Sequence, residues 1–281
     1  MCLHQTIAIL RCEPTLSGDR KLLHLKLSVQ LSTLGLPLKS AFPVAAELGA
    51  SAVEIDARQE LPLPVSRTAV RQLLKWLDDY RLRISCLTFQ IRHGLGDSAN
   101  LERRVEAIKE NLRLAYQLGC SSLVCDVGEI PPPEQAENRS VWLEVANELG
   151  RFAHKEGAFL TARTGVSAPK VLAEFLREAN PGSLMVDLDP GNLILHGHAW
   201  DTATTELGAF IAHLHARDAV RDFSARRAVE VEVGRGSVDW AAILAGLEQH
   251  GFNGYTTIGR LGASNPKLEY QQAAEYLQNL F

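Results

Sequence analysis

The chain alternates eight times between a short apolar run and a longer amphipathic run, and this alternation is the feature that most restricts its fold. Short apolar runs indicate buried strands, and longer runs with helical periodicity indicate helices that cover them. The predicted strands are 25–31, 52–57, 83–89, 122–127, 159–164, 184–189, 211–217 and 255–260. The predicted helices are 39–48, 66–80, 100–118, 139–156, 168–178, 202–207, 238–250 and 267–280. Strictly alternating strands and helices favour a parallel sheet.

Two architectures accommodate such a sheet: an open doubly wound sheet and a closed barrel. Eight strand–helix units within 281 residues match the usual size of a closed barrel. No G-x-G-x-x-G follows the first predicted strand, which argues against a dinucleotide-binding sheet. We therefore expect one α/β domain, a (β/α)₈ TIM barrel over residues 23–281, preceded by a loose N-terminal extension over 1–22. Residues 226–233 alternate like a strand inside the seventh loop, so a short hairpin is expected near the barrel mouth.

Composition narrows the class of partner. The net charge of −4 gives no general attraction to nucleic acid or to an anionic membrane, and neither is expected as a partner. No apolar run reaches the length of a membrane span. The five cysteines form no C-x-x-C pair, which favours a reducing, cytoplasmic setting in which Cys86 and Cys125 are inert buried thiols. Composition does not define an oligomeric state, and a homo-oligomer is one of the open expectations.

Charged residues gather at the predicted strand ends, where barrel active sites are built. The candidates are Glu54, Arg92, Glu129, Arg163, Asp187, Asp189, Asn192, His215, Arg217, Arg221, Arg235 and Arg260. Glu54 is equally compatible with a structural hydrogen bond. The arginines come from the ends or the following loops of four strands, so a locally basic mouth is expected in an acidic protein. Pairing with neighbouring carboxylates is the alternative.

Four motifs at successive units resemble the xylose isomerase-like barrels, which include sugar and sugar-phosphate isomerases and epimerases. They are 189–192 (DPGN), 213–218 (HLHARD), 234–240 (GRGSVDW) and 254–260 (GYTTIGR). The resemblance covers about residues 25–280. It implies carbohydrate metabolism and a divalent metal, Mn, Zn or Mg, held by two glutamates, an aspartate and a histidine.

The matching metal ligands are incomplete. Asp189 opens the family's D-x-x-H pattern, but Asn192 stands in place of the histidine, and His215 matches the family's later histidine. Asp187 could serve instead of Asp189, and His213 instead of His215. If a metal is held, Asp189, Asn192 and His215 are its expected ligands.

Two departures from the family pattern weigh against that metal. Arg163 stands where a Leu-x-x-Glu-Thr-Gly glutamate is expected, and Gly259 stands where an Ile-Glu-Arg glutamate is expected. The guanidinium cannot act as a base near neutral pH, and glycine has no side chain. We therefore expect no cofactor and no two-glutamate proton shuttle, in a degenerate metal site where Arg163 supplies positive charge.

These features predict a sugar or sugar-phosphate isomerase/epimerase-like barrel that binds a small polyhydroxylated, anionic ligand: a sugar, sugar phosphate or sugar acid. As an enzyme it would use Asp189, His215 and Glu129 as proton carriers and Arg163 as electrophile. The alternatives are a non-catalytic binding or regulatory relative, and a metal-dependent isomerase, epimerase or dehydratase with non-standard ligands. A repair endonuclease ranks below these, because its multi-metal ligand set and a basic DNA face are not visible.

Overall fold

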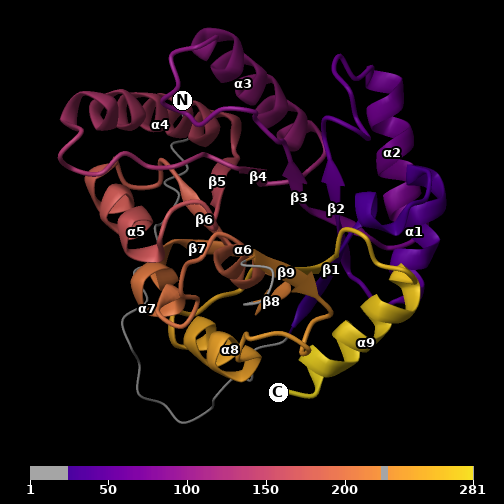
Figure 1. Ribbon diagram of the computed structural model, residues 1–281. Coiled ribbons are helices and arrows are strands. Elements are labelled where there is room, and N and C mark those ends of the chain that lie inside the picture. Colours follow the sequence, from indigo (N-terminus) through magenta and orange to yellow (C-terminus); the bar gives the residue numbers. More distant parts are fainter. Residues whose placement is uncertain (1–24, 223–226, 281) are drawn as a thin grey trace, which may run out of the picture.

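The computed structural model describes residues 25–222 and 227–280 (Figure 1). The predicted extension 1–22 lies outside the described residues. Eight parallel strands close into a barrel in the order β1-β10-β7-β6-β5-β4-β3-β2, which confirms the predicted TIM barrel. The strands are β1 (Lys26–Gln30), β2 (Ala52–Asp56), β3 (Arg83–Thr88), β4 (Ser122–Cys125), β5 (Phe159–Arg163), β6 (Met185–Leu188), β7 (Ile211–Ala216) and β10 (Tyr255–Ile258).

Helices α1 (Leu38–Glu47), α2 (Arg67–Asp79), α3 (Leu101–Gln117), α4 (Ala136–Glu156), α5 (Pro169–Glu178), α7 (Ala203–Leu207), α8 (Trp240–Gln249) and α9 (Pro266–Gln278) form a ring outside the strands (Figure 1). The short helix α6 (Pro190–Leu195) lies inside this ring, against the β8–β9 hairpin described below. Short 3₁₀ turns follow β1 (Leu31–Leu34) and precede β7 (Gly208–Phe210). Each long helix turns an apolar stripe toward the strands, as the 3.6-residue period requires. Within the described residues, none of the helices combines the length and apolarity needed to cross a bilayer.

Helix α6 was not predicted, although its start follows ordinary capping rules. The Asp189 side chain accepts a hydrogen bond from the Asn192 backbone N–H, and Pro190 occupies the first helical position. The DPGN motif, interpreted as the end of a strand, is therefore also a helix start. This gives Asp189 a structural task that the sequence analysis did not foresee.

The hairpin predicted near the seventh loop is present, but it begins earlier than expected. Strand β8 (Asp218–Asp222) pairs in antiparallel fashion with β9 (Arg227–Val231). Both strands pack against α6. Asp218 anchors the following segment: its carboxylate accepts from the backbone N–H groups of Gly234, Gly236 and Val238 and from the Trp240 indole N–H. The hairpin is therefore tied to the start of α8 by one buried carboxylate.

Candidate functional site

Five charged or titratable side chains from four strands meet at the barrel axis. They are Glu54 on β2, Arg163 on β5, Asp187 on β6, and His213 and His215 on β7. The other four are buried, and the Arg163 side chain is only 8% exposed. Such charges are tolerated away from water only when they are paired with one another. The five residues are called the axial cluster below.

Arg163 is the central cation of the axial cluster. Its Nε donates to Asp187 Oδ2 at 2.8 Å, and its Nη2 lies 3.2 Å from His215 Nδ1. The same Nη2 lies 4.0 Å from Glu54 Oε1. One guanidinium therefore contacts a carboxylate and an imidazole and approaches a second carboxylate.

His213 is held in one orientation by partners on both sides of its ring. Nδ1 lies 2.7 Å from Asp187 Oδ1, and Nε2 lies 2.9 Å from the Thr257 hydroxyl. Because a carboxylate can only accept, the proton of the ring belongs on Nδ1, and Nε2 accepts from Thr257. Asp187 therefore joins Arg163 to His213 through its two oxygens.

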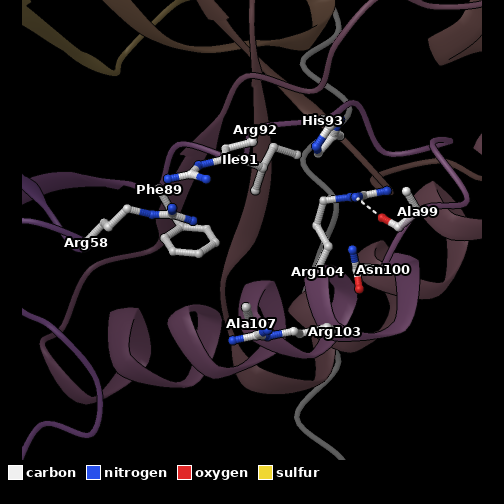
Figure 2. Close-up of a pocket in the computed structure, with 10 residues that line it drawn as sticks. All are labelled: Arg58, Phe89, Ile91, Arg92, His93, Ala99, Asn100, Arg103, Arg104 and Ala107. Carbon is white, nitrogen blue, oxygen red and sulfur yellow. Dashed lines mark hydrogen bonds between the residues drawn. The ribbon is translucent and has the colours of Figure 1, made fainter.

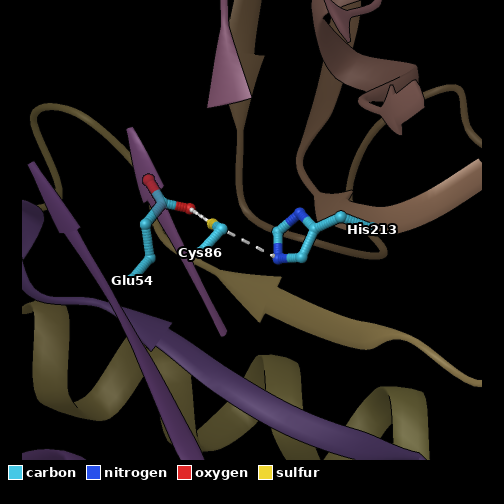
Figure 3. Close-up of side chains that lie close together, drawn as sticks. All are labelled: Glu54, Cys86 and His213. Carbon is cyan, nitrogen blue, oxygen red and sulfur yellow. Dashed lines mark hydrogen bonds between the residues drawn. The ribbon is translucent and has the colours of Figure 1, made fainter. Parts of the chain in front are cut away.

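Glu54 is the least satisfied member of the axial cluster. Its Oε2 accepts from the Cys86 thiol at 3.5 Å and lies 3.3 Å from His215 Nε2 (Figure 3 shows Glu54, Cys86 and His213). Its Oε1 is buried without a hydrogen-bond partner among the described residues. A buried unpaired carboxylate oxygen is costly, so this atom is a point at which a bound donor would be stabilised.

Electrostatics within the cluster hold it charged. Burial by itself would lower the pKa of Arg163, but Asp187 and Glu54 raise it well above its ordinary value. Burial would raise the pKa of Asp187, but Arg163, His215 and His213 hold it well below the usual range. Burial is the largest influence on the pKa of His215 and would lower it, yet Glu54 and Asp187 together outweigh burial and the net shift is upward.

Two overlapping groups of donors lie close enough for one cation. One is Glu54, Cys86 and His213, and the other is Asp187, His213 and His215, with the donor atoms in each group within 4.8 Å of one another. Arg163 is bonded to two members of the second group. In the first group the Cys86 thiol would have to ionise, and burial raises its pKa well above the ordinary value. A dication at either place would meet the Arg163 guanidinium or a protonated thiol.

The predicted metal ligands Asp189 and Asn192 are not brought together with His215. Asp189 caps α6 and pairs with Arg217, whose Nη1 lies 3.0 Å from Asp189 Oδ2. The Asn192 side-chain amide donates to the Thr164 carbonyl at 2.7 Å. Asp187, which the sequence analysis named as the alternative, is the carboxylate that meets both histidines.

The candidate arginines do not converge on one site. Arg217 is largely buried between Asp189 and Glu230, while Arg260 forms a two-pronged pair with Glu269. The others are exposed on separate loops: Arg92 after β3, Arg221 on β8 and Arg235 before α8. Glu129, a predicted proton carrier, is also exposed. Arg163, Arg217 and Arg260 pair with carboxylates, which was the alternative to a basic barrel mouth. Ligand-binding roles for the exposed three stay predictions.

Gly259, the second departure from the family pattern, lies where there is no room for a side chain. A Cβ atom at Gly259 would lie 2.6 Å from both Cβ and Oε1 of Gln30 on the neighbouring strand. Contacts below 3.0 Å force a neighbour to move, so Gln30 occupies the space that a side chain at 259 needs. The position is closed to a ligand carboxylate in this structure.

Some contacts at the axis were missed from the sequence. Cys86 is buried as predicted, but it also touches two members of the axial cluster. The cross-strand register between Glu54 and Cys86 explains this contact, and no sequence signal reveals that register. Thr257 was likewise unremarkable in the sequence, although its hydroxyl binds His213.

The comparisons with known proteins agree with the fold. Residues 42–280 match the family model described as xylose isomerase-like TIM barrel, and the chain belongs to that family. No curated protein matches the chain. A xylose isomerase domain protein from Planctomyces limnophilus is 23% identical with a TM-score of 0.79, over 90% of this chain and 95% of that one.

Two further solved structures share the fold at lower identity. D-psicose 3-epimerase from Clostridium cellulolyticum H10, solved with D-tagatose, is 15% identical with a TM-score of 0.74, over 91% of this chain and 99% of that one. A xylose isomerase-like TIM barrel protein from Mycobacterium smegmatis, in complex with magnesium, is 16% identical with a TM-score of 0.70, over 91% and 95%. Sugar epimerases are thus among the structural neighbours.

Proposed function

We propose that this chain is a small-molecule-binding member of the xylose isomerase-like barrels in which Arg163 replaces the family's divalent metal. Its ligand is a small polyhydroxylated anion: a sugar, sugar phosphate or sugar acid. One observation carries the proposal: the Arg163 guanidinium bonds to Asp187 and His215, two of the three side chains in the donor group that contains no thiol. The residues at the axis therefore do not fit a tightly bound dication.

The charges of the axial cluster support this proposal. The Arg163 guanidinium already supplies a cation to the carboxyl groups of Asp187 and Glu54, which raise its pKa. A unit-charge pair about 4 Å apart is worth roughly 4 kcal/mol at an effective dielectric of 20, and a dication doubles that repulsion. Binding a metal beside Arg163 would cost more than the remaining donors return.

The geometry also indicates what the cluster can do for a ligand. Arg163 is a fixed donor that can orient and polarise a carbonyl or carboxylate oxygen, and the free Glu54 Oε1 can accept from a hydroxyl. A cavity lined by Arg163 has a volume of only about 10 Å³, so a ligand that enters there needs neighbouring side chains to move. Binding is therefore expected to be coupled to opening of the barrel mouth.

A second candidate is a metal-free isomerase or epimerase, and one observation favours it. His215 lies 3.3 Å from Glu54 Oε2 and 3.2 Å from the Arg163 guanidinium, which places a proton carrier beside a base and a cation. Such a group could return a proton that another group removes. Asp189 fits less well as the partner base, because both of its oxygens are engaged.

Metal content is the test of the leading proposal. Protein purified without chelator should contain well below one equivalent of Mn, Zn or Mg by elemental analysis, and adding Mn²⁺ should produce no saturable heat in calorimetry. Arg163→Glu removes the cation and adds a carboxylate, so this variant should take up metal. Stoichiometric metal in the wild type would overturn the proposal.

Turnover separates the two candidates. A panel of ketoses and ketose phosphates should bind without proton exchange if the protein is a binding relative. Exchange of substrate hydrogen with solvent deuterium that disappears in His215→Gln would establish the enzyme. Cytoplasmic location and homo-oligomerisation stay predictions.

A further inference from the structure

We propose that a second site, the arginine pocket beside the start of α3, binds the phosphate group of a small organic phosphate ester. The pocket has a volume of about 380 Å³ and lies between the loop after β2, the loop after β3 and the first turns of α3 (Figure 2). It does not include any member of the axial cluster. The proposal is independent of the function proposed for the barrel axis.

The lining is strongly cationic. Arg58, Arg92, Arg103 and Arg104 all border the pocket, and no carboxylate is among its lining residues. Arg58, Arg92 and Arg103 form no ion pair within the described part of the chain. Unpaired like charges held together repel one another, so a bound anion would relieve that repulsion.

Arg104 supplies a second, independent sign of a missing partner. Its two terminal nitrogens donate to the backbone carbonyls of Ala99 and Asp97, which fix the side chain in place. Its Nε is buried and has no hydrogen-bond partner among the described residues. A buried unpaired N–H of a charged group is costly, so Arg104 holds a donor that the described residues leave unused at the edge of the pocket.

The start of α3 adds to the positive electrostatic potential of the arginine pocket. Asn100 precedes this 17-residue helix with φ of 56°, and its side chain makes no capping hydrogen bond. The backbone N–H groups of Glu102 and Arg103 likewise have no partner within the described residues. An uncapped helix start carries partial positive charge and donors suited to an anion.

The remaining walls indicate an ester rather than a free anion. Phe89 and Ile91 give the pocket an apolar surface, and the Arg58 guanidinium stacks 4.9 Å from the centre of the Phe89 ring. A second hollow, of about 470 Å³, shares Arg58, Phe89 and Arg103 and extends to Pro62 and Leu63. The organic part of an ester would lie there while arginine forks hold its phosphate.

Calorimetric titration tests the proposal with inorganic phosphate, phenyl phosphate and phenol as probes, none of which is a sugar that the barrel axis would take. Both phosphates should bind saturably and phenol should not, and the ester should bind more tightly than inorganic phosphate. The double variant Arg92→Gln/Arg103→Gln should weaken phosphate binding by about a hundredfold, because each charged hydrogen-bond donor is worth about tenfold or more.

Arg151→Gln, on the exposed face of α4, is the matched control and should bind phosphate like the wild type. The substituted side chains are exposed, so all variants should fold, and thermal unfolding checks that they do. Absence of saturable phosphate binding, or equal binding by the double variant and the control, would overturn the site. Equal affinity for the ester and for inorganic phosphate would overturn the assignment to an ester.

Discussion

At the barrel axis, Arg163 is enclosed by Asp187, Glu54 and His215 and is almost inaccessible to solvent. Beside α3, Arg58, Arg92 and Arg103 stand at a surface pocket and have no carboxylate partner among residues 25–222 and 227–280. Both regions lie at the ends of barrel strands, and both are rich in arginine. The difference is burial: a buried guanidinium must be neutralised by the protein itself, whereas an exposed one can be left for a ligand.

A charged residue at a strand end can therefore have one of two roles: it pairs with a carboxylate of the fold, or it stays available to a ligand. Arg163, Arg217 and Arg260 are each paired with carboxylates of the fold, and removing one partner leaves the other uncompensated. Arg58, Arg92 and Arg103 are exposed, so we expect their removal to cost little stability and their guanidinium groups to be accessible to a ligand. Substitutions in the two regions should therefore have opposite signatures in stability and in binding.

The largest expected effect comes from Arg163→Leu. Loss of the guanidinium leaves Asp187 and the nearby Glu54 buried without their cation, so the free energy of unfolding should fall by about 3–5 kcal/mol. Urea denaturation measures this change, with the highly exposed Arg235→Leu as control. A loss below about 1 kcal/mol would show that the axial charges are not mutually dependent.

A smaller steric effect is expected at Gly259. Gly259→Ala places a Cβ 2.6 Å from Gln30 Cβ and should cost about 1–3 kcal/mol of unfolding free energy. Adding Gln30→Gly removes the obstructing atom, so the double variant should be more stable than the sum of the single changes implies. Additive losses in this double-mutant cycle would mean that Gln30 does not close the position.

The pH dependence of stability gives the next effect. The pKa of His215 is raised above its ordinary value of 6.5 in the folded protein, so its contribution is complete below pH 6.5 and is lost as pH rises through the folded value. Chemical denaturation from pH 6.5 upward should show a decline that His215→Gln flattens.

Glu60 has its own pH window. Burial raises its pKa from 4.5 to about 7, so stability is lost as pH rises between these values. Glu60→Gln should flatten the curve in this lower window and leave the decline above it, and His215→Gln should do the reverse. If stability varied with pH in the same way for both variants, neither pH window could be assigned to Glu60 or to His215.

The smallest stability effect is expected for Arg103→Gln. The side chain is exposed and makes no ion pair in the described part of the chain, so the free energy of unfolding should change by less than about 0.5 kcal/mol. The same variant should weaken phosphate binding. A large stability loss would place Arg103 with the paired arginines and erase the contrast between the two regions.

The barrel was predictable because the alternation of buried strands and amphipathic helices is a local property of the sequence. The eight predicted strands lie within one or two residues of those observed, and the family match at 42–280 covers all of them except β1. Arg163 and Gly259 could also be identified as departures from the family pattern, because each lies within a local motif of the sequence. Helix α6 was not predicted, because the DPGN motif forms both the end of a strand and the start of this helix.

Contacts between strands could not be derived from the sequence. The choice of Asp187 over Asp189 depends on which carboxylate caps α6, and the role of Cys86 depends on the register of β2 against β3. The arginine pocket joins Arg58 to residues far along the chain at Arg103 and Arg104. Closure of the barrel sets these distances, and no spacing within a motif encodes them.

Anomalous diffraction from crystals grown with manganese tests most directly whether Arg163 has taken the metal's place. The account predicts guanidinium density between Asp187 and His215 and no anomalous peak within bonding distance of Asp187, His213 or His215. An ordered manganese ion at those side chains, with Arg163 turned away from Asp187, would contradict it.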